Sequence, residues 1–410
     1  MYFLYNIAIY ITDFLLKAIA VFNKKIRLFV KGRKETFSKL ESSISKNDKT
    51  IWFHCASLGE FEQGRPIIEK IKEKYTDYKI ILTFFSPSGY EIRKDYTHAD
   101  VVVYLPLDTR LNAKRFLKVV HPKMAIFVKY EFWPNILNEL QKQKIETILI
   151  SGIFRKDQAF FKSYGSWMRK SLKAFSQFFV QNEVSRDLLQ SIGFKNVTLS
   201  GDTRFDRVFE ITKQDNTLDF IEDFKQNKYT LVAGSTWPKD EEVLVNYINL
   251  HASEEEKFII APHNINQQQI KELQNSITKT TTKFTDEKRD SSAQVFILDT
   301  IGVLTKVYSY ADVAYIGGGF GDGIHNILEP ATFGLSLIIG PNYNKFQEAI
   351  DLVALGSCKA VKNQEELDSE LQKLSSNVGY REQNGQISRD YISRNIGATQ
   401  IILQYTSNKL

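Results

Sequence analysis

The sequence has few of the residues that build disulfide frameworks and metal sites. Only two cysteines, Cys55 and Cys358, occur in 410 residues, which excludes a disulfide scaffold and fits a reducing compartment. The six histidines are scattered without paired spacing, so we expect no metal site. A net charge of +6 is modest for this length, and no groove-reading or base-reading motif accompanies it. We therefore expect no nucleic-acid partner.

The length and composition predict a folded protein with more than one core. Hydrophobic residues make up 43% of the chain and charged residues 25%, as in ordinary globular proteins. Because domains usually hold about 100–200 residues, a chain of 410 residues predicts two domains.

Residues 1–22 are almost entirely apolar, and a basic segment follows them. On a helix, Asn6, Asp13, Lys17 and Lys24 fall in one narrow stripe, and the rest of the surface is apolar. No acid lies between Asp13 and Glu35. The basic residues of this interval beyond the apolar run are Lys24, Lys25, Arg27, Lys31, Arg33 and Lys34. The pattern predicts that residues 1–34 form a membrane-associating helix with its basic side toward an anionic cytoplasmic leaflet.

Other interpretations of this segment remain open. A cleaved signal peptide needs a basic start, and nothing basic precedes Lys17. A full membrane span is possible, since about 20 residues suffice. A buried first helix is the structural alternative. The polar stripe favours a helix that lies in the interface or docks on its own protein.

Beyond residue 50, short β-rich runs alternate with helical patterns. The first series of expected strands covers 51–56, 79–85, 101–105, 124–130, 147–151, 178–181 and 197–200. The second series covers 230–233, 258–261, 295–298, 313–316 and 337–340. The charged stretch 207–229 is the expected connection, and 278–292 is an expected exposed loop. The pattern predicts two α/β, Rossmann-like, doubly wound domains, 35–211 and 212–390, with ligands at the carboxyl ends of their strands.

Three motifs follow strands of the first series. Glu60, in Ala56-Ser57-Leu58-Gly59-Glu60, is expected in the first turn of a helix, where it is either a functional acid or a favourable charge on the helix dipole. Ser86-Pro87-Ser88-Gly89 either binds a phosphate on its amides or caps a helix. In Glu131-Phe132-Trp133-Pro134-Asn135, Pro134 suits helix position N1 and Trp133 suits core packing. Glu131 needs a partner, because it lies between a buried strand and two aromatic residues.

The second series carries a glycine-rich motif. Gly317–Asp322 contains four glycines, yet its spacing matches neither a dinucleotide fingerprint nor a Walker loop. A helix that opens with Asn326 and carries Glu329 would offer amides to a phosphate and a carboxylate to ribose hydroxyls. The alternative is a glycine turn with an N-cap Asn. Other strand ends carry Ser235-Thr236, before a helix expected near Asp240, and Pro262-His263.

Taken in order, these motifs resemble one family, the 3-deoxy-D-manno-octulosonic acid (Kdo) transferases of lipopolysaccharide synthesis. The resemblance covers nearly the whole chain. It is carried by the apolar N-terminus, Lys31-Gly32-Arg33-Lys34, Trp52-Phe53-His54-Cys55-Ala56-Ser57-Leu58-Gly59-Glu60, Glu131-Phe132-Trp133-Pro134-Asn135, Gly201-Asp202-Thr203-Arg204-Phe205-Asp206, Ala233-Gly234-Ser235-Thr236, Asp299-Thr300-Ile301-Gly302, Ala311-Asp312-Val313-Ala314, the glycine run, and residues 325–330.

The resemblance implies a GT-B glycosyltransferase architecture, with two Rossmann-like domains facing across a cleft and a C-terminal helix, 391–410, returning to the first domain. It implies an inverting enzyme that moves Kdo from CMP-Kdo to the lipid A precursor (lipid IVA) without a metal or other cofactor. The implied location is the cytoplasmic face of the inner membrane.

The resemblance also implies roles for individual residues. Glu60 matches the general base, and Glu131 and Arg204 match transition-state stabilisers. The expected donor site comprises Ser235, Thr236, Pro262, His263, Ile301, Gly302, Val303, Gly318, Gly319, Asn326, Ile327, Leu328 and Glu329. The expected acceptor site comprises Ser57, Gly59, Ser86, Ser88, Arg155, Lys156 and Lys162.

Three positions depart from the family pattern. Lys129 stands where an acid is common, Arg204 replaces a lysine, and His263 replaces an arginine. The basic residues between Arg155 and Lys173 suit a phosphorylated acceptor, although a solvated helix face is the ordinary explanation. The rival functions are another GT-B enzyme that uses a UDP-sugar, and a non-catalytic lipid-binding protein at the membrane surface.

Overall fold

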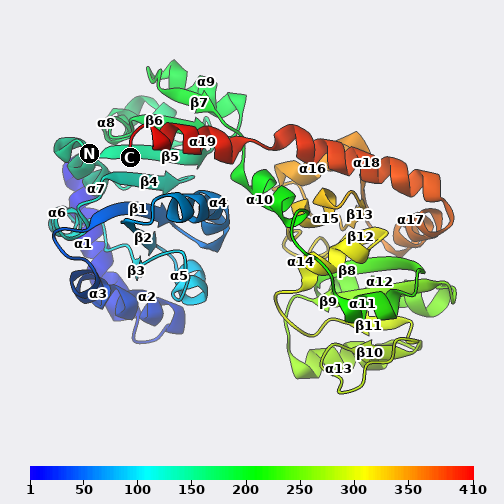
Figure 1. Ribbon diagram of the computed structural model, residues 1–410. Coiled ribbons are helices and arrows are strands. Elements are labelled where there is room, and N and C mark those ends of the chain that lie inside the picture. The colour runs from blue at the N-terminus through cyan, green and yellow to red at the C-terminus, as the bar shows by residue number, and fades with distance from the viewer. The chain divides into compact units, whose positions relative to one another are not determined.

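The computed structural model describes residues 1–410, apart from the side chain of Lys25, so that member of the expected basic segment lies outside the described residues. The chain divides into two compact units (Figure 1): Met1–Asp206 with Ile396–Leu410, and Arg207–Asn395. The first division falls inside helix α10 (Thr203–Ile211), five residues before the expected boundary at 211/212. Helix α18 (Val378–Asn395) runs through the expected boundary at 390/391.

The first unit is built on a seven-stranded parallel sheet in the order β3-β2-β1-β4-β5-β6-β7. Its strands are β1 (Lys49–Cys55), β2 (Tyr78–Phe84), β3 (Val101–Tyr104), β4 (Met124–Val128), β5 (Glu146–Gly152), β6 (Gln177–Val180) and β7 (Val197–Leu199). Its helices are α1 (Tyr2–Ile19), α2 (Lys24–Lys34), α3 (Thr36–Ser43), α4 (Leu58–Lys74), α5 (Pro87–Arg93), α6 (Arg110–Val120), α7 (Pro134–Gln143), α8 (Ser166–Leu172), α9 (Glu183–Ser191), the first four residues of α10, and α19 (Ala398–Ser407).

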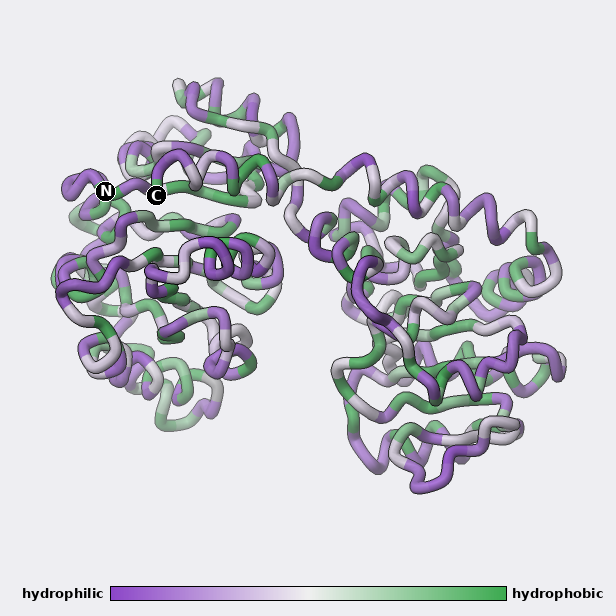
Figure 2. The backbone as a smooth tube through the Cα atoms, in the orientation of Figure 1, coloured by the Kyte–Doolittle hydropathy of each residue, from purple (hydrophilic) through white to green (hydrophobic). Residues whose placement is uncertain are grey.

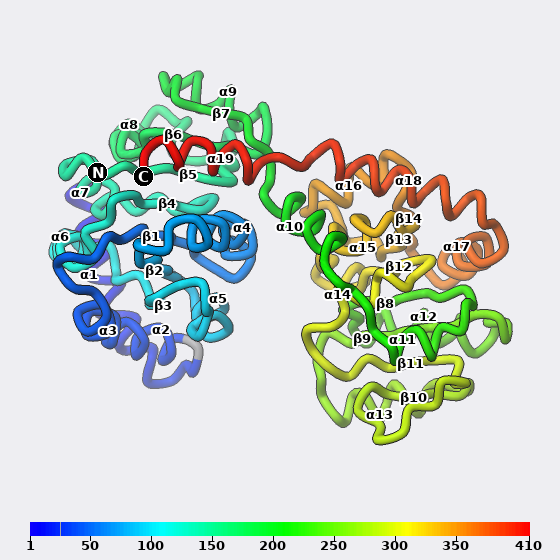
Figure 3. The backbone as a smooth tube through the Cα atoms, viewed as in Figure 1, coloured from blue at the N-terminus to red at the C-terminus, as the bar shows by residue number. Residues whose placement is uncertain are grey.

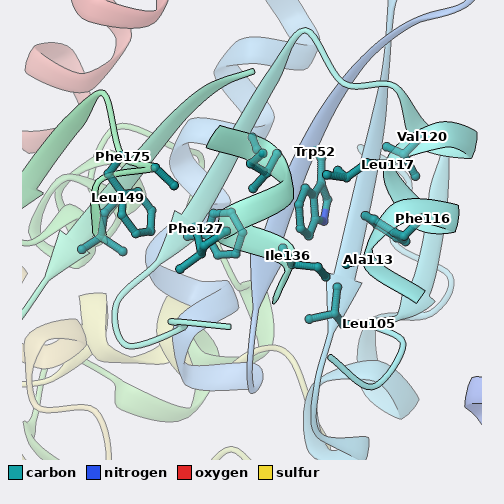
Figure 4. Close-up of a cluster of buried hydrophobic side chains, with 14 of the residues drawn as sticks. Trp52, Leu105, Ala113, Phe116, Leu117, Val120, Phe127, Ile136, Leu149 and Phe175 are labelled. Atoms are coloured by element: carbon teal, nitrogen blue, oxygen red, sulfur yellow. The ribbon is translucent and has the colours of Figure 1, made fainter. Parts of the chain in front are cut away.

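Side chains of the inner strand β1 alternate between two apolar cores, as the two-residue period of a strand requires. Trp52 packs edge-on against Phe116 and Phe127, at ring-centroid distances of 4.8 and 5.0 Å (Figure 4). Ile51 and Phe53 belong to the cluster on the opposite face. Helices therefore cover both faces of the sheet, which is the doubly wound arrangement expected from the sequence.

The second unit contains a parallel sheet in the order β10-β11-β9-β8-β12-β13-β14. Its strands are β8 (Tyr229–Thr236), β9 (Glu256–Pro262), β10 (Thr281–Lys283), β11 (Val295–Ile297), β12 (Val313–Ile316), β13 (Ser336–Ile339) and β14 (Cys358–Ala360). Its helices are α11 (Asp219–Lys225), α12 (Pro238–Leu250), α13 (Gln267–Ser276), α14 (Leu304–Val307), α15 (Leu328–Thr332), α16 (Gln347–Leu355), α17 (Gln364–Ser376) and α18. The strands of both sheets are mostly hydrophobic (Figure 2).

Each expected strand is present, with ends that differ by no more than three residues. Two edge strands were not expected. Strand β10 lies inside 278–292, so the expectation of a loop there is wrong at Thr281–Lys283, which pairs with β11. Strands β10 and β14 have three residues each, too few to show an alternating pattern.

One strand end and one helix start differ from the expected positions, each for a local reason. Strand β4 ends at Val128 rather than Tyr130, because Lys129 adopts a left-handed conformation with φ of 69° and turns the chain. The helix expected to open at Asn326 begins at Leu328 instead and has only five residues, with Pro330 in its first turn. Asn326 still accepts a hydrogen bond from the Leu328 N–H, at 3.2 Å.

Helix α1 docks on the first unit through a few polar groups. The Tyr2 hydroxyl donates to Asn135 Oδ1 at 2.5 Å, and the Tyr5 hydroxyl donates to Asp108 Oδ2 at 2.6 Å. No residue of α1 is buried, so the alternative of a buried first helix is wrong. The polar stripe is shorter than expected, because α1 ends at Ile19 and Lys24 begins α2.

The outer surface of α1 is apolar. Phe3 is 72% exposed and Phe14 is 73% exposed, and Phe22, in the turn after the helix, is 91% exposed. Among the described residues, α1 is the helix whose length and apolar composition would allow a membrane crossing. The same composition occurs in core helices and signal sequences, so this is weak evidence by itself.

The C-terminal segment belongs to the first unit (Figure 3). The Asp206 carboxylate accepts hydrogen bonds from the N–H groups of Gly397 and Thr399, at 2.5 and 2.6 Å, and so caps the start of α19. Tyr405 on α19 donates to Glu146 on β5 at 2.7 Å. The motif Gly201–Asp206 therefore ends in a residue with a structural function.

Candidate active site

Glu60 lies at the carboxyl end of β1, in the first turn of α4. Its carboxylate accepts the Ser57 N–H at 2.9 Å, and together with the Ser57 side chain it forms a capping box. The side chain is only 8% exposed. Burial raises the pKa of Glu60, the Glu131 carboxylate adds to this effect, and His54 opposes it. Glu60 is thus both a helix cap and a partly protonatable acid beside a second acid.

Glu131 is held by two side chains at one carboxylate oxygen. The Trp133 indole N–H donates to Glu131 Oε2 at 2.6 Å, and His54 Nε2 lies 3.0 Å from the same oxygen. His54 Nδ1 contacts the Thr83 hydroxyl on β2 at 2.8 Å. In the tautomer with its proton on Nε2, His54 would donate to Glu131 and could accept from Thr83 at Nδ1. The partner that the sequence required for Glu131 is therefore His54 together with Trp133.

Sequence reasoning did not assign His54 or Trp133 to the site. His54 stands in a run of apolar strand residues and is fully buried, so its need for a polar partner was the available signal. Trp133 was interpreted as core packing. Its ring does pack, stacked on Phe85 with centroids 4.6 Å apart, and its N–H also positions Glu131.

The Tyr130 hydroxyl lies near both basic and acidic side chains of the first unit. Arg155 donates to the Tyr130 hydroxyl at 3.1 Å. Burial raises the pKa of Tyr130, whereas the Arg155 and Arg204 guanidinium groups lower it and Glu60 raises it. These three charged groups therefore lie close enough to one another to act on the same hydroxyl.

Arg204 is paired in this structure. Its Nε donates to Asp202 Oδ2 at 2.9 Å, and Asp202 also accepts from Gln63 Nε2 of α4 at 3.1 Å. The guanidinium is about one-third exposed, at 31%. Asp202 fixes its direction, a function that sequence reasoning did not assign to that residue.

Four of the remaining acceptor-site candidates lie at the same sheet edge as Glu60. Ser57 is the N-cap of α4 and Gly59 lies in its first turn, so both adjoin Glu60. Ser86 caps α5 through the Ser88 N–H and donates its own N–H to the Ala56 carbonyl at 2.7 Å. These residues come together at one sheet edge.

Lys156 and Lys162 are not part of this group. Among the described residues, neither forms a hydrogen bond or ion pair with Glu60 or Glu131. The segment 153–165 consists of turns and short 3₁₀ stretches, so the helix face considered for the basic residues does not extend to Arg155 or Lys162.

In the second unit, three aromatic rings stack at the ends of β8, β9 and β12. His263 lies between Trp237 and His325, with ring centroids 4.8 and 4.4 Å away. The Trp237 N–H donates to His325 Nε2 at 2.9 Å, which requires the neutral His325 tautomer with its proton on Nδ1. Burial lowers the pKa values of both His263 and His325.

Asp240 organises the glycine run. It is fully buried and accepts hydrogen bonds from the Tyr315 hydroxyl and the Gly318 N–H, each at 2.8 Å. The expected helix start near Asp240 is two residues late, because α12 begins at Pro238. Gly318 has a φ of 94°, a conformation that favours glycine. At Gly319 a Cβ would lie 2.5 Å from the Gly340 nitrogen, so β13 also requires glycine there.

Glu329 is fixed at both carboxylate oxygens. Thr305 donates to Oε2 at 2.8 Å and Asn326 donates to Oε1 at 2.9 Å. The other donor-site candidates Ser235, Thr236 and Pro262 end strands β8 and β9, and Ile327 and Leu328 are buried. The Ile301-Gly302-Val303 stretch forms a loop in which Ile301 is 85% exposed.

The described residues place no three or more His, Cys, Asp or Glu side chains together as a metal site would need.

Comparisons with known proteins identify a family that this chain resembles. The family model of 3-deoxy-D-manno-octulosonic-acid transferase (kdotransferase) matches residues 31–207. A 3-deoxy-D-manno-octulosonic acid transferase of Rickettsia felis is 28% identical over 83% of this chain and 74% of its own length. The enzyme of that name from Aquifex aeolicus is 28% identical over 82% of this chain and 89% of its own length.

The fold has relatives among solved structures. UDP-GlcNAc 2-epimerase from Neisseria meningitidis, bound to UDP-GlcNAc, aligns with a TM-score of 0.60 and 15% identity over 88% of this chain and all of that one. At this identity the likeness establishes the GT-B fold alone. The family model matches residues 31–207 and both relatives are 28% identical over most of the chain, so the chain is similar to the 3-deoxy-D-manno-octulosonic acid transferase family of glycosyltransferases.

Proposed function

We propose that this protein transfers Kdo from CMP-Kdo to the lipid A precursor, lipid IVA, with inversion and release of CMP. The observation that carries the proposal is the pair Glu60 and Glu131, which lie at one sheet edge and act on each other electrostatically. One is buried with a raised pKa, and the other is oriented by His54 and Trp133. Two acids in different environments suit two different functions.

Glu60 acts as the general base. In its ionised form it takes the proton of the acceptor hydroxyl while that oxygen attacks the anomeric carbon of Kdo. The new carbon–oxygen bond forms as the bond to the CMP phosphate breaks, and CMP leaves as the anion. Glu131 and Arg204 stabilise the charges that develop in the transition state.

The second unit holds the donor. Glu329, already oriented by Thr305 and Asn326, accepts ribose hydroxyls. His263 and the Nδ1–H of His325 are neutral donors for anionic groups, since the pKa of each ring is lowered. Pro262 and the 301–303 loop flank the base, and Ser235, Thr236, Gly318 and Gly319 allow close backbone approach.

The acceptor is a diphosphorylated lipid, and the first unit offers cations for it. Arg155, Lys156 and Lys162 are the proposed phosphate ligands, with Arg155 already directed at Tyr130. The exposed apolar face of α1 and the basic residues of α2 attach the protein to the anionic cytoplasmic leaflet of the inner membrane, where such a lipid resides. No metal or other cofactor takes part.

The test is direct. Purified protein is incubated with CMP-Kdo and lipid IVA in mixed micelles, with and without EDTA, and the lipid product is weighed by mass spectrometry. We expect the lipid to gain Kdo in both samples. An unchanged lipid mass contradicts the proposal, and loss of activity only in EDTA contradicts its metal-free form.

Thermal shift separates the rival functions. Stabilisation by CMP in preference to UDP is expected. A preference for UDP would indicate a UDP-sugar enzyme, and the absence of any nucleotide effect would indicate a non-catalytic lipid-binding protein.

A further inference from the structure

A cavity of about 270 Å³ lies in the first unit, and neither Glu60 nor Glu131 belongs to its lining. Residues of α1, α2 and α3 line it together with the segment 106–112, which follows β3. At roughly 30 Å³ for each water molecule, its volume corresponds to about nine waters, enough for a compact polar group with a short length of hydrocarbon.

The wall of this cavity is amphipathic. Leu16, Phe29 and Leu107 supply apolar surface. The charged lining consists of Lys17, Arg33 and Lys34 against one acid, Asp13. Lys17 and Asp13 pair with each other at 2.5 Å, so two cations, Arg33 and Lys34, have no carboxylate partner among the described residues. An apolar wall with a cationic end matches a lipid that carries a phosphate.

Arg33 is held in place by the protein and is incompletely satisfied. It donates to the carbonyls of Phe29 and Phe85, at 3.2 and 2.7 Å, and its guanidinium carbon lies 3.4 Å from the Phe29 ring centroid. Its Nε is buried without a hydrogen-bond partner among the described residues. Two bonds use only part of the five N–H donors of a guanidinium.

The position of Arg33 follows from the glycine before it. A Cβ on Gly32 would lie 2.2 Å from a ring carbon of Tyr104, so only glycine lets α2 pack this closely against β3. Burial lowers the pKa of Arg33 to about 9, which records the cost of a buried cation without a counter-ion. An anion in the cavity would remove that cost.

We propose that this cavity binds one anionic glycerophospholipid of the bilayer, with its phosphate on Arg33 and Lys34 and its glycerol and first methylenes against Leu16, Phe29 and Leu107. The neighbouring outer surface of α1 is exposed and apolar, so a lipid bound here continues into the same hydrocarbon layer. The site is discrete and holds one lipid. It therefore differs from the diffuse attraction of basic residues to a charged leaflet, and its lining includes none of the acceptor residues of the proposed function.

Native mass spectrometry of the full-length, delipidated protein in detergent tests this site. Phosphatidylglycerol, phosphatidylcholine and inorganic phosphate are added in separate samples. We expect phosphatidylglycerol to saturate at one molecule per chain, and neither of the other two to do so. Equal binding of the two lipids, no saturation, or equal binding of phosphate alone overturns the proposal.

Matched variants locate the lipid. Lys34→Gln and Lys31→Gln remove the same charge from the same helix, but only Lys34 lines the cavity. Lys34→Gln should weaken phosphatidylglycerol binding about fivefold, as one lysine near a charged lipid would, and Lys31→Gln should change it by less than about twofold. Leu16→Trp should abolish binding by filling the cavity. Equal effects of the two lysine variants would indicate diffuse attraction and contradict the proposal.

A competition experiment distinguishes this phospholipid site from the acceptor site of the proposed function. Lipid IVA should leave the bound phosphatidylglycerol in place. Displacement of one phospholipid by one lipid IVA would make the cavity part of the acceptor site and overturn the inference. Either result leaves the Kdo-transfer assay unaffected, so the two proposals fail independently.

Discussion

The Trp133 indole N–H and the Glu131 carboxylate form a 2.6 Å hydrogen bond between residues only two positions apart. The same carboxylate oxygen lies 3.0 Å from Nε2 of His54, which is on strand β1. Two donors from different segments therefore fix one acid. Because its stacking on Phe85 also sets the direction of the indole, Trp133 is a positioning residue for Glu131.

Trp133→Phe should keep the stacked ring and lose the N–H. We expect kcat for Kdo transfer to fall about 10- to 100-fold, because hydrogen bonds to charged groups contribute about 1.5–3 kcal/mol. The KM values for both substrates should change little, since the proposed function of Glu131 is to stabilise the transition state. Steady-state kinetics measure this, with the melting temperature of the variant as the control for folding. A kcat within twofold of wild type would remove Trp133 from this function.

The substitution Glu60→Gln removes the proton-accepting function of Glu60 but keeps its helix-capping function. Glutamine can still occupy the third position of a capping box, so α4 should remain folded. It cannot accept a proton, and transfer should fall by about 10²–10⁴ with CMP affinity nearly intact. Retention of more than a tenth of the activity, in protein with an unchanged melting temperature, would show that Glu60 is only a cap.

The raised pKa of Glu60 has a consequence for pH dependence. The base must be ionised, so the acidic limb of kcat/KM should lie at higher pH than an ordinary glutamic acid would give. The folded state holds this proton more tightly than the unfolded state, so the associated stability is present below the unfolded pKa. It is lost as pH rises through the folded pKa. Wild type should therefore lose stability relative to Glu60→Gln as the pH rises through this range.

Glu329→Ala should weaken CMP binding by about 10- to 150-fold, if its carboxylate holds ribose hydroxyls through charge-assisted hydrogen bonds. Thr305→Val is the matched control, because it removes one bond to the same carboxylate without removing the charge. Calorimetry with CMP should show a much smaller loss for Thr305→Val. Equal losses for both variants, or none for Glu329→Ala, would indicate that Glu329 only anchors its loop.

Tyr5→Phe tests how α1 is attached. The pKa of Asp108 is raised from 3.8 to about 6 by burial, although the Tyr5 hydroxyl partly opposes this rise by donating to the ionised form. Because the folded pKa is the higher one, the stability linked to Asp108 is present below pH 3.8 and is lost as the pH rises through about 6. Removing a donor to the carboxylate raises that pKa further.

The loss of stability in Tyr5→Phe should therefore be larger at pH 8 than at pH 5, by about 1–3 kcal/mol. Urea unfolding at the two pH values measures the difference. A loss that is the same at both values would mean that the hydroxyl does not act on the charge of Asp108.

Replacing Phe3, Phe14 and Phe22 by serine should release the protein from membranes. Each exposed phenylalanine contributes about 1.5–3 kcal/mol when it enters an apolar phase. These substitutions leave the docking contacts of Tyr2 and Tyr5 intact, whereas deletion of residues 1–34 would remove them and the packing of Arg33. CMP affinity should be unchanged, and activity should fall on acceptor in bilayers but not in micelles.

Serine at Val184, Leu250 and Leu355, exposed apolar residues on other surfaces, provides the control and should leave membrane binding unchanged. If high salt or carbonate strips none of the wild-type protein, and a protease in the periplasm reaches a tag at Met1, then α1 crosses the membrane and does not lie on it.

Much of the fold could be predicted because its signals are local. The alternation of apolar strands with helical patterns gave both sheets, and the Ser57–Glu60 spacing placed Glu60 in the first turn of α4. Pro134 stands at the helix position its ring favours. Such signals arise from hydrogen bonds and steric limits within a few residues, so a single sequence contains them.

The partners of the site depend on contacts between residues far apart in the chain. Glu131 meets His54 across 77 positions, and Gly318 meets Asp240 across 78. Which two buried polar groups satisfy each other depends on which strands become neighbours, and the local sequence does not contain that order. The sequence by itself therefore determined the elements and the acids at their ends. Only the tertiary structure decided that Glu131 is fixed by His54 and Trp133, and that Arg33 lines an amphipathic cavity without a carboxylate partner of its own among the described residues.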